Sequence, residues 1–160
     1  MHVLGRISVV WATMANVGAT DGQHTTSTQL DSHANMAVVG DHATVFSRSG
    51  RKADVKPFSS DCSKLESVPI VDAAVAYDCP RSMKTYILAF RNALYVPSMN
   101  HNLTPPFVMR EAGITVNDVP KIQTKEKDLN DKTHCIVATE GDNGVDLKIP
   151  LSLDLSLIHI

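Results

Sequence analysis

The chain has 160 residues, 43% of them hydrophobic and 20% charged, which fits one globular domain with modest tails and leaves little room for a second core. Its 15 Lys and Arg residues against 17 Asp and Glu give a formal net charge of −2, which disfavours a protein that binds nucleic acid through a basic surface. The cysteines Cys62, Cys79 and Cys135 are widely separated and form no CxxC pair, so neither a disulfide framework nor a zinc knuckle is indicated.

Two further classes of site are disfavoured by pattern. No apolar run approaches the ~20 residues that a membrane-spanning helix needs, so we expect a protein without membrane partners. The seven histidines form no HxxxH or HxH pair, so solvated or hydrogen-bonded histidines are expected rather than metal ligands. We therefore expect neither a metal nor another cofactor.

Residues 1–28 are expected to form a flexible lead-in, because residues 21–28 (DGQHTTST) are polar and lack periodicity. The domain is predicted to span residues 29–154. Residues 155–160 (LSLIHI) are interpreted as translated adapter sequence joined to a truncated reading frame, with no function of their own.

Short runs rich in β-branched and aromatic residues, separated by Gly, Pro, Ser and Asp, predict a mostly antiparallel β domain. The predicted strands cover residues 37–40, 43–46, 53–58, 68–77, 85–90, 93–96, 134–138 and 145–153. Residues 124–132 (TKEKDLNDK) are almost all polar or charged and predict an exposed loop.

One helix is predicted over residues 105–112. Thr104 suits the N-cap, Pro105 suits the first helical position, and Gly113 suits the left-handed residue that follows a helix. Apolar residues along one side favour packing against the sheet.

The stretch that carries chemistry is QLDSHANMAVVG, residues 29–40. An apolar residue, Asp-Ser, two small or polar positions and an apolar strand are how aspartic proteases place a carboxylate on a tight turn. Asp31 is the candidate catalytic carboxylate, Ser32 could brace the turn by hydrogen bonding across a dimer axis, and Ala34 permits close approach. His33 completes the turn. An Asp-Ser pair in a loop is by itself more often a simple turn or a helix cap.

Peptide hydrolysis of this kind needs two carboxylates that share one proton, because like charges held close together cannot both ionise. No second Asp-Ser or Asp-Thr occurs in the chain. The pair would therefore come from two copies of Asp31 in a two-fold homodimer. A Ser-His-Asp hydrolase built from Ser32, His33 and Asp31 is disfavoured, since neighbours in sequence rarely reach triad geometry.

The segment DSHANMAVV resembles the retroviral-type protease signature, and NALYVPSMNHNLTPPFVMREAGI (residues 92–114) resembles a downstream pattern of copia-type retrotransposon proteases, with Leu-Tyr-Val-Pro and Asn-Leu. The order and spacing of the two blocks make this resemblance more specific than the catalytic motif alone. It covers residues 29–116.

The resemblance implies the retropepsin fold, a small acid-protease β barrel with one short helix that dimerises. It also implies a flap hairpin within residues 53–71, with its tip at residues 58–64 and substrate contacts from Phe58, Ser59 and Ser60. The implied activity is that of an aspartic endopeptidase acting on peptide segments of its own polyprotein, in the cytoplasm or in virus-like particles.

Two departures from the family pattern bear on activity. His33 replaces a Gly that gives the turn conformational freedom, and the segment NLTPP around Leu103 lacks the hydrophobic-hydrophobic-Gly element that braces the catalytic turn in many retropepsins. Two alternatives therefore stay open: an inactive retropepsin-like domain used for dimerisation or peptide binding, and a β-rich interaction domain whose resemblance is accidental.

Overall fold

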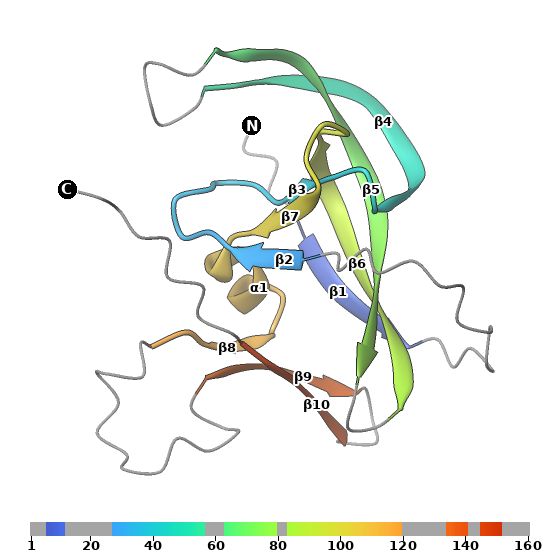
Figure 1. Cartoon of the computed structure of the whole chain (residues 1–160), viewed down its shortest axis with the longest axis vertical. Helices are drawn as coiled ribbons and strands as arrows, with labels where there is room; N and C mark the ends of the chain where they lie inside the picture. Colours follow the sequence, from blue (N-terminus) through green and yellow to red (C-terminus); the bar gives the residue numbers. More distant parts are fainter. Residues whose placement is uncertain are drawn as a thin grey trace. The chain divides into compact units, whose positions relative to one another are not determined.

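A computed structural model describes residues 6–11, 27–56, 63–79, 83–119, 134–140 and 145–151 of the chain. In these ranges strands dominate, and the one helix has six residues (Figure 1). The prediction of a mostly β fold with one short helix is thus confirmed. The chain divides into two compact units, Met1–Ala112 and Gly113–Ile160, each with a sheet of its own.

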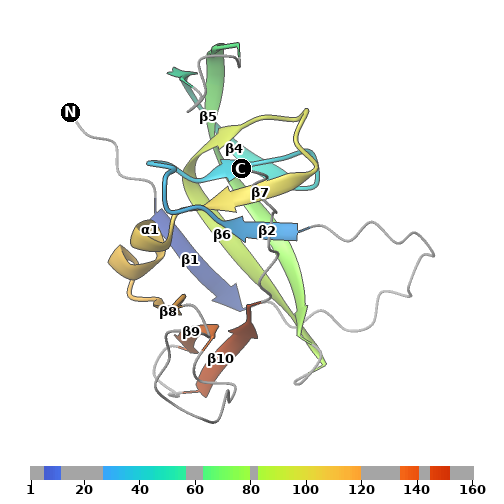
Figure 2. The same ribbon diagram turned by 60° about the vertical axis from the view of Figure 1, so that its left-hand side comes forward.

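The first unit is built on a seven-stranded sheet with the order β2-β7-β3-β6-β5-β4, and β1 pairs with β6 outside this path (Figures 1 and 2). Most neighbours are antiparallel, whereas β2 with β7 and β3 with β6 are parallel. Its elements are β1 (Arg6–Trp11), β2 (Ser27–Leu30), β3 (Val38–Val39), β4 (Thr44–Val55), β5 (Leu65–Cys79), β6 (Lys84–Tyr95), β7 (His101–Thr104) and α1 (Pro106–Glu111).

The strands predicted over residues 43–46 and 53–58 form one strand, β4, and those over 85–90 and 93–96 form one strand, β6. Bulges explain why the sequence suggested breaks. The register between β4 and β5 shifts around Gly50, which has φ +72°, and Asn92 within β6 has φ +55°. Turn-forming residues thus serve as bulges that bend continuous strands.

Parts of the expected lead-in belong to the sheet. Arg6–Trp11 form β1, antiparallel to β6, and β2 begins at Ser27, two residues before the predicted domain start. Neither β2 nor β7 was predicted, since each has only four residues and its pairing partner lies far away in the sequence.

The helix is confirmed with different ends. It begins one residue later than predicted, because Thr104 is the last residue of β7 and Pro105 takes the N-cap position without a side-chain cap. The prediction of Thr104 as N-cap was therefore wrong. The C-terminal prediction was right, since Gly113 has φ +80° directly after the C-cap residue Ala112.

A buried apolar cluster joins β3, β5 and β6, and partly buried apolar residues of the turn before β3, of β4 and of β7 pack against it. Its buried members are Val38, Val68, Ile70, Leu94 and Val96. The turn before β3 and the strands β4 and β7 therefore pack on the same core as β3, β5 and β6.

In the second unit, β8 (Thr115–Asn117), β9 (Cys135–Glu140) and β10 (Val145–Pro150) form an antiparallel sheet in the order β10-β9-β8. The predictions of strands over residues 134–138 and 145–153 are confirmed, with shifted ends. The loop predicted over residues 124–132 lies outside the described residues. Over the part of the chain that is described, no helix is long and apolar enough to cross a bilayer.

Candidate functional site

Asp31 directly follows β2 and opens the turn that leads to β3. Both strands lie next to β7, with Leu30 of β2 beside Thr104 in a parallel pair and Val38 of β3 beside Leu103 in an antiparallel pair. The backbone N–H of Asp31 donates to the carbonyl oxygen of Thr104 at 3.1 Å. A strand from some seventy residues later in the chain is thus inserted between the two strands that carry the turn (Figure 1).

Asn102 of β7 ties the strands on both sides of it together. The residue is 1% exposed, its Oδ1 accepts from the backbone N–H of Gly40 at 3.0 Å, and its Nδ2 donates to Thr28 Oγ1 at 3.2 Å. A buried amide with its hydrogen bonds made costs little, whereas an unpaired one is expensive. Asn102 therefore links Thr28 of β2, which precedes the Asp31 turn, to Gly40, which follows β3.

The carboxylate of Asp31 is oriented from within its own turn. Its Oδ1 accepts from the backbone N–H of His33 at 2.9 Å, and its side chain is 33% exposed. Hydrogen bonding of this kind fixes the side chain and leaves the carboxylate partly open to solvent. The turn thus presents an anchored carboxylate at the surface of the protomer.

Ser32 and His33 are exposed and face each other, with Ser32 Oγ 3.4 Å from His33 Nδ1, and Ala34 is partly buried. The His33 ring is 84% exposed, and its Nδ1 lies 4.0 Å from Asp31 Oδ1. The structure thus brings Asp31, Ser32 and His33 together. The predicted contact of Ser32 across a dimer axis stays a prediction.

The turn accommodates His33 without backbone strain. Among the described residues other than glycine, positive φ values occur at Ser67, Met83 and Asn92, so His33 has an ordinary backbone conformation. The close approach that requires a glycine occurs at Gly40 instead, where a Cβ atom would lie 2.3 Å from the carbonyl oxygen of Met99. The turn within the protomer is therefore formed with His at position 33, where the signature that it resembles has Gly.

The antiparallel strands β4 and β5 overlap residues 53–71, where the resemblance implies a flap hairpin, and the flap itself stays a prediction. The two strands are antiparallel up to the pair Val55–Leu65, and Phe58, Ser59 and Ser60 lie outside the described residues. Met36 of the Asp31 turn packs against the same apolar cluster as Val55 of β4. The hairpin and the turn therefore rest on a common core.

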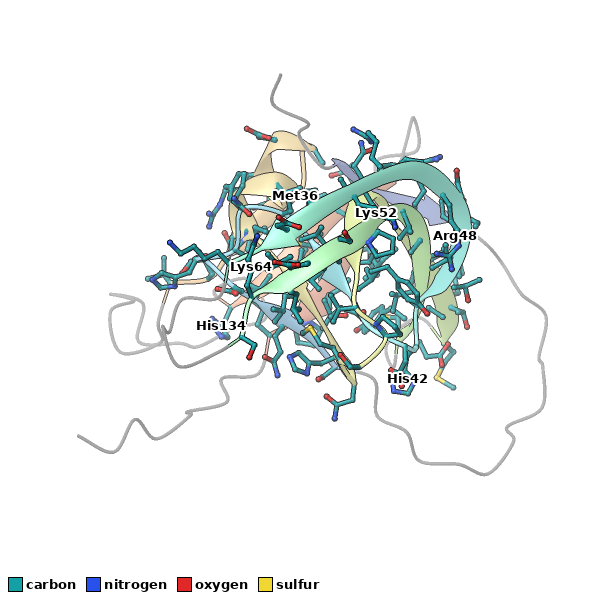
Figure 3. The ribbon with its side chains drawn as sticks, turned by 90° about the horizontal axis from the view of Figure 1, so that it is seen from above. Met36, His42, Arg48, Lys52, Lys64 and His134 are labelled. Carbon is teal, nitrogen blue, oxygen red and sulfur yellow. The ribbon has the colours of Figure 1, made fainter. Side chains whose placement is uncertain are left out.

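An ionic clasp, defined as Asp54 with Lys64 and Ser67, joins the two strands near the end of this hairpin. Lys64 Nζ donates to Asp54 Oδ2 at 2.8 Å, and the backbone N–H of Ser67 donates to Asp54 Oδ1 at 3.0 Å. The hydrogen bond from Lys64 holds the pKa of the Asp54 carboxyl below its ordinary value, and the same bond raises the pKa of the Lys64 ammonium. Figure 3 looks down on this hairpin, with Lys64 and, on β4, Lys52 labelled.

From sequence, Asn102 was assigned no role, and Thr104 was assigned only a role as helix N-cap and none at the Asp31 turn. The only available signal was the Asn-Leu pair of the copia-type pattern, which corresponds to Asn102 and Leu103. Their contribution depends on the insertion of β7 between β2 and β3, which no local pattern reveals.

Comparisons with models of protein families, with curated proteins and with solved structures found no match to this chain.

Proposed function

We propose that the chain is a retropepsin-type aspartic endopeptidase in which two copies of Asp31, one from each protomer of a two-fold homodimer, activate a water for peptide hydrolysis. The observation that carries the proposal is the Asp31 turn, held between β2 and β3 by the inserted strand β7 and by the bond from Asp31 N–H to Thr104. The proposal includes the acid-protease β barrel and the copia-type polyprotein as substrate, which the motifs at residues 29–40 and 92–114 support.

In the proposed reaction the two Asp31 carboxyl groups share one proton. The ionised member takes a proton from water, whose oxygen attacks the scissile carbonyl carbon, while the protonated member donates a hydrogen bond to the carbonyl oxygen. The C–N bond then breaks as the nitrogen receives a proton, leaving a carboxylic acid and an amine. The bond from His33 N–H to Asp31 Oδ1 keeps each carboxyl group oriented for this exchange.

The β4–β5 hairpin would act as the flap that covers a bound peptide. Its apolar residues share a core with Met36, and the ionic clasp of Asp54 with Lys64 and Ser67 links its two sides close to the end. An extended polyprotein segment would lie between the hairpin and the Asp31 pair. This assignment places the enzyme in the cytoplasm or in virus-like particles, where such a polyprotein is processed.

A second candidate function is that of an inactive retropepsin-like domain that dimerises or binds peptides. It is favoured by the imidazole of His33, which lies 4.0 Å from the Asp31 carboxylate where the family pattern has no side chain. Against it stand the ordinary backbone of the turn and the exposure of the ring, which leaves the carboxylate 33% exposed within the protomer.

The test is turnover of peptides from the polyprotein by the wild-type chain and by Asp31→Asn, with Asp41→Asn as the matched control at an exposed turn after β3. Asp31→Asn keeps the side-chain shape and removes the ionisable group, so we expect a loss of ~10²–10⁴ in rate. A statine-type inhibitor should abolish the wild-type activity. Wild-type turnover that survives in Asp31→Asn would place the chemistry elsewhere, and dimerisation without any turnover would favour the inactive domain.

A further inference from the structure

The side chain of His33 is highly exposed beside the candidate carboxylate. Its ring is 84% exposed, and its Nδ1 lies 4.0 Å from Asp31 Oδ1 and 3.4 Å from Ser32 Oγ. The backbone N–H of Asp31 donates to the carbonyl oxygen of Thr104, and the Asp31 carboxylate accepts from the His33 N–H. Any ligand that approaches Asp31 closely enough to react therefore also meets the imidazole.

We propose that His33 selects the substrate, by favouring peptides that carry a carboxylate side chain on a residue next to the scissile bond. The proposal rests on the proposed function in one respect, namely that peptides bind over Asp31. It adds the chemical class of the side chain that the site prefers.

Geometry limits which part of the peptide His33 can reach. An extended peptide advances roughly 3.3 Å per residue, and its side chains alternate between its two faces. We take the scissile carbonyl to lie within hydrogen-bonding distance of Asp31. The side chain of the next peptide residue, if it is two or three bonds long, then comes within reach of the imidazole, which lies 4.0 Å from the Asp31 carboxylate. The residues that flank the scissile bond are therefore the ones that His33 contacts.

Charge decides the kind of side chain. A pair of Asp31 carboxylates carries negative charge and by itself repels an acidic substrate residue. An imidazole ring offers an N–H donor in its neutral form and two in its protonated form, and it is well suited to a carboxylate acceptor. His33 would thus offset the repulsion from Asp31, and its removal should reverse the preference rather than merely weaken binding.

Two peptides that differ only in Glu or Lys beside the scissile bond test this inference. Wild-type chain, His33→Gly and His33→Gln are compared, with His42→Gln as the matched control, because His42 lies in the turn between β3 and β4. We expect the wild type and His42→Gln to cleave the Glu peptide about tenfold better in kcat/KM, as one charge-assisted contact allows. His33→Gly should cleave the Lys peptide at least as well as the Glu peptide. An unchanged ranking in both His33 variants would overturn the proposal.

Binding to the Asp31→Asn chain, measured by calorimetry with the same two peptides, separates this inference from the proposed catalysis. Selective binding of the Glu peptide supports the inference if His33→Gly abolishes that selectivity, even where the wild type cleaves neither peptide. A wild type that cleaves neither peptide would overturn the catalytic proposal alone. Equal binding of both peptides with and without His33 would overturn the inference and leave catalysis standing. If His33→Gly lacks the wild-type thermal transition, His33→Gln is compared with the wild type instead. Gln retains an N–H donor at similar reach but has no cationic form. Its preference for the Glu peptide should therefore be smaller than that of the wild type.

Discussion

The backbone N–H of Gly40 donates a 3.0 Å hydrogen bond to Oδ1 of Asn102, which lies 62 residues further along the chain and is buried. The same side chain donates to Thr28 Oγ1 on the other side of β7. One amide therefore links the strand that enters the Asp31 turn to the residue that follows β3. The cross-link thus joins the two ends of the candidate turn.

Asn102→Ala should destabilise the chain by about 2–3 kcal/mol, because it leaves the buried N–H of Gly40 without its acceptor. The free energy of unfolding from urea titration measures the effect. Asn100→Ala is the matched control, since Asn100 is exposed next to β7 and should change stability by less than about 0.5 kcal/mol. Equal effects of the two variants would mean that the Asn102 amide does not hold the turn.

Gly40→Ala should be destabilising, because its Cβ would lie 2.3 Å from the carbonyl oxygen of Met99 and 2.9 Å from that of His101. Both atoms belong to the backbone and cannot rotate away, so we expect a loss of about 1–3 kcal/mol or more. Gly50→Ala is the comparison for steric crowding, since no atom lies within 4 Å of the Cβ position there and its cost arises from the positive φ alone. A Gly40→Ala chain as stable as the wild type would show that the segment around Met99 can move.

Thr104→Val should leave the fold intact and raise its stability by up to about 1 kcal/mol, because a buried hydroxyl without a partner is replaced by a methyl group of similar shape. Within the described residues, Thr104 Oγ1 is buried and makes no hydrogen bond. Thr28→Val is the opposite case, since Thr28 Oγ1 accepts from Asn102, and it should lower the melting temperature. A melting temperature that falls in Thr104→Val would reveal a partner for the hydroxyl.

Asp72 should make the first unit sensitive to acid. Burial raises the pKa of its carboxyl, but the hydrogen bonds from Asn92 N–H and Arg91, with the charges of Arg91 and Arg51, outweigh this and hold the pKa below its ordinary value of 3.8. A lowered folded-state pKa contributes stability above 3.8 that is lost as the pH falls below 3.8 through the folded-state value.

Asp72→Asn should therefore be less stable than the wild type at about pH 6 and should lose less stability between about pH 6 and about pH 3. Urea unfolding at the two pH values measures both changes. A variant with the same pH dependence as the wild type would show that the bonds from Arg91 and Asn92 contribute no linkage.

The proposed dimer predicts activity that depends on concentration, because each protomer would supply one Asp31 and dilution below the dimer dissociation constant would remove the shared pair. Specific activity and sedimentation are measured over the same dilution series. Constant specific activity in a species that sediments as a monomer would rule out the shared pair.

Local sequence was sufficient for the β class, for most of the long strands and for the end of the helix. The alternation and β-branched content of residues 68–77 predicted the centre of β5, and Gly113 marked the residue after the helix, because both signals act within a few residues. The motif at residues 29–40 likewise made Asp31 the candidate carboxylate from local sequence alone, and its catalytic role stays a prediction.

Tertiary structure alone decided what surrounds Asp31. The four-residue strands β2 and β7 have too little periodicity to be recognised, and they form because each is the other's hydrogen-bonding partner across more than seventy residues. The same pairing kept Thr104 in a strand although its sequence suits a helix cap, and it gave Asn102 its buried partners. Pairing between distant segments depends on the whole chain, so the residue types at positions 31–34 suggested a candidate chemistry, whereas the packing of β7 determined where the turn that carries them lies.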